Sequence, residues 1–289
     1  MDGSGLTTPR AASWNPLRVD GTALPPGWLL AAKLLACWLF PGTRFLAAGP
    51  PFLPFVPFLD APAFASWLAP ATAAVFYVAF ACLLFNRAVR TACLAIAGCL
   101  LVHILGHRLA YANNAVFLGV FLFLIGLYDA RTGLWPLRIQ LVLVYFGASL
   151  NKALDPDWWN GRYFDTLMID ALGLGWYRSM ASSLPAGWLG SSFGALTIAT
   201  EATIGSTVLA ARDGRAGVAL MVTFHLAMLA ATRGLLSLPF AYASVAVSAP
   251  FLYPWLQSFD RRWNGLAVVA AYWALAFFIR LLPRILSWV

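Results

Sequence analysis

Apolar residues in this chain form long runs, and charged residues, proline and glycine interrupt these runs at intervals. Most of the runs approach the ~20 residues that a helix needs to cross a lipid bilayer, and their helical periodicity is weak, as is typical of helices that face lipid. We therefore predict an all-α fold, a polytopic transmembrane helical bundle of about eight to nine spans. The expected spans are at about 27–47, 64–85, 88–107, 112–128, 135–153, 188–211, 215–232, 235–254 and 265–285.

Composition supports an integral membrane protein and excludes several other classes. Hydrophobic residues make up 61% of the 289 residues and charged residues 10%, with a mean hydropathy of +0.77. No soluble domain of this length could bury so much apolar surface in one core. The net charge of +8 comes mainly from arginines at the ends of the apolar runs, without the basic and aromatic array of a nucleic-acid interface. The four cysteines lie inside apolar runs without metal-ligand spacing, which favours buried thiols.

The arginines also predict an orientation. With the N-terminus in the cytoplasm, most of them fall in cytoplasmic turns, as the positive-inside rule requires. Residues 1–26 are then an uncleaved cytoplasmic segment, and 27–289 form a single transmembrane domain with an exoplasmic cap at about 155–187. The alanine and arginine bias indicates a bacterial inner or plasma membrane.

Lys152 is the first candidate for chemistry. It and Lys33 are the only lysines in the chain, and it closes the apolar segment 135–153 just before an acidic, tryptophan-rich turn. A lysine near the end of a span can also snorkel to the membrane interface at little cost, so a structural reading stays open. Asn151 precedes it and is a candidate positioning partner.

Glu201 and His225 form the second candidate. Glu201 is the only glutamate in the chain and lies in the middle of an apolar segment, where a carboxylate costs about 2.5 to 3.5 kcal/mol and needs a partner. Counting from the turn at 212–215, Glu201 and His225 lie at the same height, roughly 15 Å along their helices. They can form a proton-handling pair with coupled titrations, or a neutral hydrogen-bonded clasp between two helices.

Two further groups of polar residues are weaker signals. His103 and His107 share a helix face, but no third ligand lies near them in the sequence, so we expect no metal site. In the segment 135–153, Gln140 and Asn151 lie on one face and Tyr145 and Lys152 on an adjacent face. These residues form a polar stripe that leads to the lysine.

Three blocks of residues then carry a resemblance to a known family. They are Gln140 to Lys152 continued by Asp155, Pro156, Asp157, Trp158 and Gly161; Tyr111 to Asn114 with Asp129 to Arg131; and Glu201 with Phe224 and His225. In order and spacing they resemble the HTTM family, the membrane domain shared with vitamin K-dependent gamma-carboxylase. The resemblance covers roughly residues 64–254, and it extends to the SdpB-type proteins that accompany secreted peptide toxins.

The resemblance implies a redox chemistry. In the carboxylase, a buried lysine of this block assists the oxidation of reduced vitamin K by oxygen, and the strong base so formed removes a γ proton from substrate glutamates before carbon dioxide adds. Lys152 is the matching position, with Glu201 and His225 as catalytic partners. The implied cofactor is a reduced quinone of the menaquinone or vitamin K type, bound by Asn151, Tyr145, Gln140 and Asn114. Ala115 stands where the carboxylase has a histidine, so full glutamate carboxylation is not expected.

Three functions follow as expectations. The first is quinol-linked oxidation or modification of a secreted peptide at a pocket on the exoplasmic side. The alternative is a non-enzymatic accessory subunit for the maturation or export of a toxin peptide, with the cap as its docking surface and a soluble protein as a further partner. A transporter is the third, because an intramembrane glutamate and histidine can mark an ion path, although no inverted repeat is evident.

Overall fold

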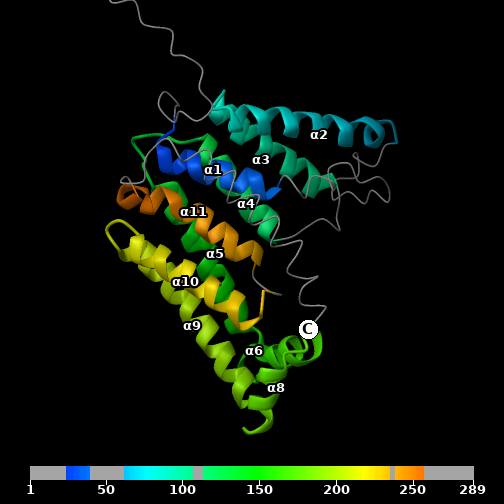
Figure 1. The fold of residues 1–289 in the computed structure, drawn as a ribbon, viewed down its shortest axis with the longest axis vertical. Coiled ribbons are helices and arrows are strands. Elements are labelled where there is room, and N and C mark those ends of the chain that lie inside the picture. Colours follow the sequence, from blue (N-terminus) through cyan, green and yellow to red (C-terminus); the bar gives the residue numbers. More distant parts are fainter. Residues whose placement is uncertain (1–23, 40–61, 107–112, 235–237, 257–289) are drawn as a thin grey trace, which may run out of the picture.

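The computed structural model describes residues 24–39, 62–106, 113–234 and 238–256, and all regular structure in these ranges is helical (Figure 1). This confirms the all-α class. The elements are α1 (Pro26–Leu39), α2 (Pro62–Leu84), α3 (Val89–Gly106), α4 (Asn113–Gly126), α5 (Trp135–Leu154), α6 (Pro156–Trp159), α7 (Arg162–Asp165), the π-helix η4 (Thr166–Ala171), α8 (Gly175–Ser182), α9 (Trp188–Ala210), α10 (Arg215–Ala231) and α11 (Leu238–Leu256).

Eight of the nine predicted apolar segments coincide with α1 to α5 and α9 to α11. The ninth, 265–285, and the end of the first, 40–47, lie outside the described residues. Within the described ranges, two helices are long and apolar enough to cross a membrane, Trp67–Leu84 in α2 and Trp188–Ala210. Several other helices are apolar but shorter, so the number of spans stays a prediction.

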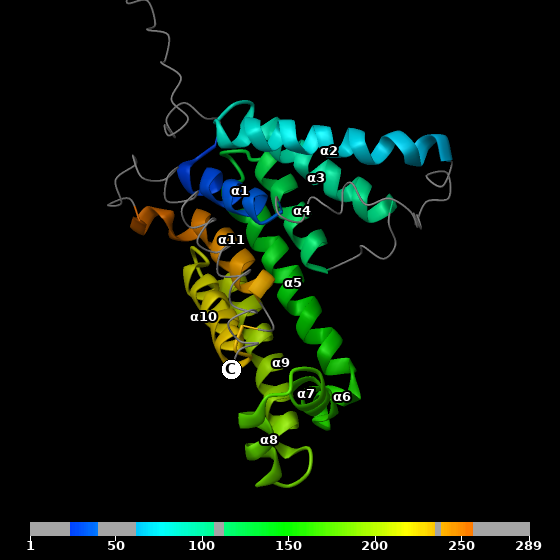
Figure 2. The same cartoon turned by 45° about the vertical axis from the view of Figure 1, so that its right-hand side comes forward.

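Helices α5 and α9 form the central pair of the molecule. They lie side by side and antiparallel, and the short helices α6 to α8 gather at one end of the pair (Figures 1 and 2). Helix α10 packs against α9 and α11, α11 packs against α1, and α3 lies between α2 and α4. The segment 155–187, predicted as a cap, thus folds into short helices that pack mainly on α9.

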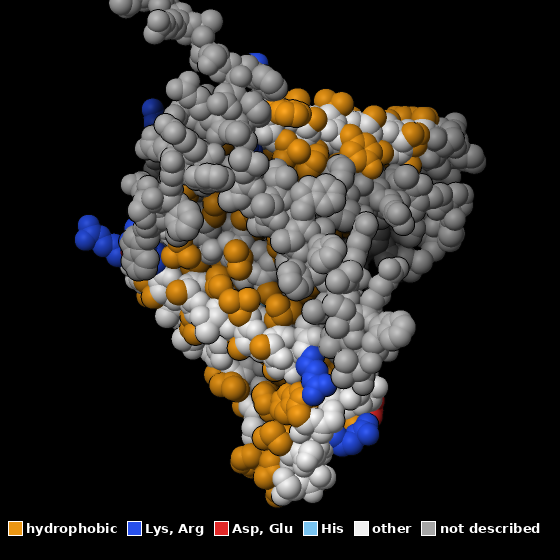
Figure 3. Space-filling model, viewed as in Figure 1, with side chains coloured by type: hydrophobic (Ala, Val, Ile, Leu, Met, Phe, Trp, Pro, Cys, Tyr) orange, Lys and Arg blue, Asp and Glu red, His pale blue; other side chains and the backbone are white. Residues whose placement is uncertain are grey.

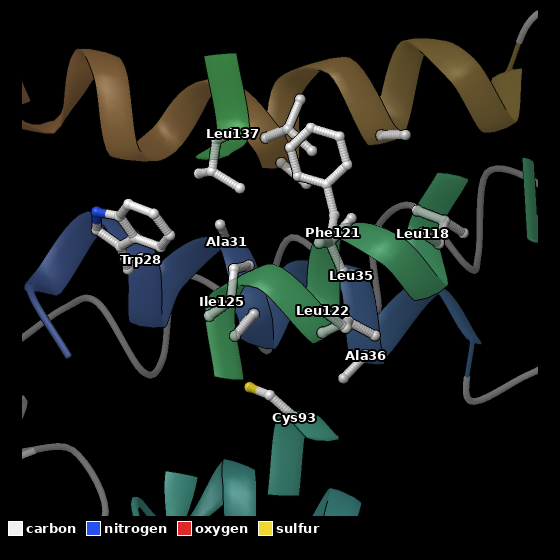
Figure 4. Packing of buried hydrophobic residues seen from close by; sticks show 14 of the residues in the cluster. Trp28, Ala31, Leu35, Ala36, Cys93, Leu118, Phe121, Leu122, Ile125 and Leu137 are labelled. Carbon is white, nitrogen blue, oxygen red and sulfur yellow. The ribbon is translucent and has the colours of Figure 1, made fainter. Parts of the chain in front are cut away.

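The main apolar core lies where α1, α3, α4, α5 and α11 meet. Figure 4 shows Trp28 and Leu35 of α1 facing Phe121 of α4 and Leu137 of α5, with Cys93 of α3 beneath them. These side chains are buried and fill the space between the helices. The four cysteines are free thiols within helices, as predicted, and all except Cys82 are fully buried.

The outer surface of the helices is also apolar. Side chains such as Val78, Leu143, Leu150 and Leu196 are more than half exposed. Figure 3 shows hydrophobic side chains along α2 and on the lower helices, with few charged side chains in the described part of that face. Contiguous exposed apolar surface of this kind is rare on soluble monomers.

A buried arginine joins α5 to the end of α9. The Arg138 guanidinium donates to the carbonyl oxygens of Val208, Leu209 and Arg212 at 2.8, 2.9 and 3.2 Å, and also to that of Ala211. The last carbonyls of a helix have no partners within the helix and carry its negative dipole end, so a cation there is favourable. Arg138 therefore caps α9 from a neighbouring helix.

Two other cations act in the same way. Lys33 Nζ donates to the carbonyl oxygen of Leu84 at 3.3 Å, at the end of α2. Arg90 Nε donates to that of Gly126 at 3.0 Å, at the end of α4. The second lysine of the chain thus has a structural role, which leaves Lys152 as the lysine to explain.

Candidate functional site

A cavity of about 550 Å³ lies between α4, α5, α9, α10 and α11 and is roofed by α6, α7 and η4. Helix α5 contributes the largest set of lining side chains. Six of the seven residues singled out from the sequence line this one cavity: Gln140, Tyr145, Asn151, Lys152, Glu201 and His225. The seventh, Asn114, lies in the first turn of α4, and its side chain is outside the described residues.

Lys152 and Glu201 form an ion pair in the cavity wall. Lys152 Nζ lies 2.9 and 2.7 Å from the two carboxylate oxygens of Glu201, and it also donates to the carbonyl oxygen of Ala148 at 3.4 Å. The Lys152 side chain is 20% exposed and that of Glu201 is 9% exposed. The lysine therefore turns toward the middle of the bundle and does not extend to an outer surface. Its pairing partner is Glu201, whereas the sequence had suggested Asn151 for positioning.

His225 is held by a tyrosine of α5. Tyr145 Oη lies 2.7 Å from His225 Nε2, and the imidazole stacks on Phe240 of α11 with ring centroids 5.9 Å apart. The hairpin of α9 and α10 predicted that Glu201 and His225 lie at one level, and both do line the same cavity. Helix α5 supplies a partner for each of them, which the hairpin geometry alone could not indicate.

An aromatic roof covers the ion pair. The buried Trp158 ring of α6 stacks on Tyr163 of α7 at 4.0 Å and meets Phe164 edge-on at 5.4 Å. Lys152 Nζ lies 5.1 Å from the centre of the Trp158 ring, a cation–π distance. Burial, and then the negative charge of Glu201, raise the pKa of Tyr163, so this phenol keeps its proton at neutral pH.

Glycines attach the roof closely to α9. A Cβ atom on Gly194 would overlap the carbonyl oxygen of Trp158, and a Cβ on Gly190 would overlap that of Gly161. Gly161 itself has a φ of 85°, a left-handed conformation that costs other residues energy. The sequence thus places glycine where the backbones of the cap and of α9 touch, which fixes Trp158 above the lysine.

The rest of the cap is tied down by two aromatic residues. Tyr177 Oη of α8 donates to Asp165 Oδ1 at 2.7 Å, and Trp176 Nε1 donates to the carbonyl oxygen of Ala231 at 3.2 Å. Burial, followed by the hydrogen bond to Asp165, raises the pKa of Tyr177. The second bond caps the last turn of α10, so the cap contacts both helices that carry the candidate acid and base groups.

Sequence reasoning missed several residues of the site. Thr197 is buried one turn before Glu201 and lines the cavity. Ser149 donates to the carbonyl oxygen of Ile198 at 3.0 Å and helps to register α5 on α9. Threonine is common in apolar helices, so Thr197 carried no signal, and the small size of Ser149 indicated close helix contact but not this hydrogen bond. Arg138 did carry a signal in the sequence, because it is the only arginine inside the segment 135–153.

Metal ligands do not gather at this site. In the described part of the chain, no group of three or more histidine, cysteine, aspartate or glutamate side chains could hold a metal ion. His103 lies on α3, away from the residues that line the cavity. His107, its predicted partner on the helix face, is outside the described ranges.

A comparison of the chain with models of protein families, with curated proteins and with solved structures finds no match. The resemblance to the HTTM family therefore rests on the three sequence blocks alone.

Proposed function

We propose that this chain is an integral membrane protein that binds a quinone-like ligand in the cavity and takes part in quinol-linked oxidation or modification of a secreted peptide. The observation that carries the proposal is the Lys152–Glu201 ion pair, which faces a cavity with aromatic walls. The resemblance to the HTTM family supplies the reaction class.

The surface of the helices supports the membrane assignment. Apolar side chains are exposed around the bundle, and each of the short turns at 85–88, 127–134 and 211–214 contains an arginine, with Arg90 and Arg215 just beyond two of them. These turns join consecutive helices at one end, opposite the cap. This distribution agrees with a bundle whose arginine-rich end is cytoplasmic.

The cavity fits the chemistry of a reduced quinone. Its volume is within the range of about 300 to 1,000 Å³ that is usual for small-molecule sites, and such sites combine apolar walls with a few polar groups. Trp158, Tyr163 and Phe224 offer faces for a flat ring, and Lys152, Glu201 and His225 offer hydrogen bonds. A reduced quinone would supply the hydroxyl protons and the electrons of the reaction.

The ion pair can handle a proton without a change in its total charge. Moving one proton from the Lys152 ammonium to the Glu201 carboxylate leaves a neutral amine beside a neutral acid, at hydrogen-bond distance. The amine can then accept a proton from a bound hydroxyl group. The Trp158 face and the Ala148 carbonyl hold the lysine in position for this step. Tyr145 fixes the orientation of the His225 ring beside it.

Native mass spectrometry with lipid extraction tests this proposal. The wild type, Lys152→Ala and Lys33→Ala are purified in a mild detergent, since Lys33 is the matched lysine outside the cavity. We expect a quinone to co-purify with the wild type and with Lys33→Ala. The amount of bound quinone should be smaller in Lys152→Ala. Turnover with reduced menaquinone and oxygen should then be lost in Lys152→Ala alone. A wild type that retains other lipids but carries no quinone would reject the redox function.

An accessory role without catalysis is the second candidate, and one observation favours it. A surface groove of about 400 Å³ lies on the cap, between α7, η4 and the turn before α9, and is lined by Arg162, Asp165 and Asp170 among others. Such mixed charges suit an extended peptide. A small secreted peptide that binds the purified wild type and equally the Lys152→Ala variant would favour this role over catalysis.

A further inference from the structure

We infer that the cavity is built for an uncharged, single-chain amphiphile that carries a hydroxyl or carbonyl group at each end. This inference rests on the proposed function for the identity of the cavity as a ligand site. It adds the charge, the length and the second polar end of the ligand.

The length follows from helix α5. Gln140, Val144, Gly147 and Ala148 line the cavity on one face of this helix, which continues to Lys152. Twelve residues at a rise of about 1.5 Å separate Gln140 from Lys152, so the cavity follows α5 for roughly 18 Å. The ring of a quinone-like ligand would fill only part of such a space, and a single chain attached to the ring can occupy the rest.

The charge follows from the ion pair. Lys152 and Glu201 compensate each other at 2.7 Å, so the wall carries no net charge at that point. An anionic head group would be attracted by the ammonium but repelled by the adjacent carboxylate, and a cation would meet the reverse. A hydroxyl or carbonyl group is a dipole and can bond to the pair without adding a charge to a poorly hydrated site.

The second polar end follows from Gln140. Within the described part of the chain, its amide has no hydrogen-bond partner, and the side chain lines the part of the cavity farthest along α5 from Lys152. The side chain is half-buried and open to the cavity, so its amide can donate and accept hydrogen bonds there. A polar group at the far end of the ligand would satisfy it, because the residues between the two polar ends are mainly apolar.

The middle of the cavity offers a precise way to block the chain. A Cβ atom added to Gly147 meets nothing within 4 Å, because it points into open space. Gly98 on α3 has the same property and is exposed away from the cavity. Gly147→Leu should therefore fill the cavity without disturbing its neighbours, and Gly98→Leu is its matched control.

The test uses photolabelling of the full chain in lipid nanodiscs. Three probes of equal length carry a diazirine at mid-chain: dodecanediol, dodecanol and dodecanoic acid. Labelled positions are mapped by mass spectrometry. We expect labelling of α5 near Gly147, about fivefold stronger with the diol than with the alcohol, as one hydrogen bond provides, and weakest with the acid. Gly147→Leu should lose the labelling, Gly98→Leu should keep it, and Gln140→Leu should make the diol and the alcohol equal.

Each contrary result removes a defined part of the inference. If the acid labelled α5 as strongly as the diol, the inference that the ligand is uncharged would be wrong. If the diol labelled the wild type no more strongly than the alcohol, the inference of a second polar end would be wrong. Labelling that persists in Gly147→Leu, or is absent from α5 in the wild type, would overturn the inference as a whole. The probes contain no quinone, so labelling of α5 in a protein that carries no quinone would reject the proposed redox function alone.

Discussion

Lys152 Nζ bonds both carboxylate oxygens of Glu201, which connects the last turn of α5 with the middle of α9. The two residues are among the rarest kinds in the chain, one of two lysines and the only glutamate. Their contact is therefore the strongest link between the sequence pattern and the three-dimensional site.

Removing the carboxylate should destabilise the protein. Glu201→Gln leaves the Lys152 ammonium in the cavity wall without a counter-charge, and breaking a buried pair on one side costs about 3 kcal/mol. We expect the midpoint of thermal unfolding in detergent to fall by roughly 5 to 10 °C. The double variant Lys152→Met with Glu201→Gln should recover part of this loss. If the double variant lost as much as the sum of the single variants, the two side chains would not be coupled.

Because Arg138 caps α9, replacing it with lysine should destabilise the protein much more than the same replacement of an exposed arginine. Arg138→Lys keeps the charge but replaces the planar donors that reach several carbonyl oxygens of α9. We expect a loss of about 2 kcal/mol in unfolding free energy, measured by thermal unfolding. Arg131→Lys in the exposed turn before α5 should change stability by less than about 0.5 kcal/mol. Similar values for both would contradict the capping role.

The contact between cap and α9 can be tested with two glycines. Gly161→Ala introduces both a left-handed backbone strain and a clash with Gly187 and Ser191, whereas Gly173→Ala introduces the strain alone, since its Cβ meets open space. We expect Gly161→Ala to be less stable than Gly173→Ala by about 2 kcal/mol. Limited proteolysis within 155–187 should be faster in Gly161→Ala. Equal stability and equal proteolysis rates of the two variants would show that the contact between the cap and α9 does not stabilise the protein.

Orientation in the membrane is testable with single cysteines. In a variant without the four native cysteines, Ser182→Cys places a thiol on the exposed cap and Asp213→Cys places one in the exposed turn between α9 and α10. With the N-terminus in the cytoplasm, a membrane-impermeant maleimide should label the first in intact cells and the second only after permeabilisation. The opposite pattern would invert the orientation, and labelling of both in intact cells would reject the spanning arrangement.

The sequence predicted the helices and most of the polar residues of the cavity because both signals are local. Apolar runs between charged breaks define α1 to α5 and α9 to α11, and polar residues inside such runs are rare enough to be noticed. Tyr145, Glu201 and His225 were found in this way. The ends of these helices were also predicted to within a few residues, because charged residues, proline and glycine mark them in the sequence.

The partners of these residues could not be predicted from local spacing. Residues 152 and 201 are separated by the whole cap, so their contact depends on how α5 packs against α9. The hairpin of α9 and α10 is short enough for its register to be counted, which is why Glu201 and His225 were placed at one level. Thr197 gave no signal because its importance comes from what lies opposite it.

The α5–α9 pair is fastened at both ends, by the guanidinium of Arg138 at one and by the Lys152 ammonium and the cap glycines at the other. Two antiparallel helices held in this way keep a fixed position relative to each other along one side of the cavity. Widening or narrowing of the cavity must then come from movement of α4, α10 or α11 on the opposite side. A ligand would therefore be admitted by movement of α4, α10 or α11, while the ion pair stays at a fixed geometry.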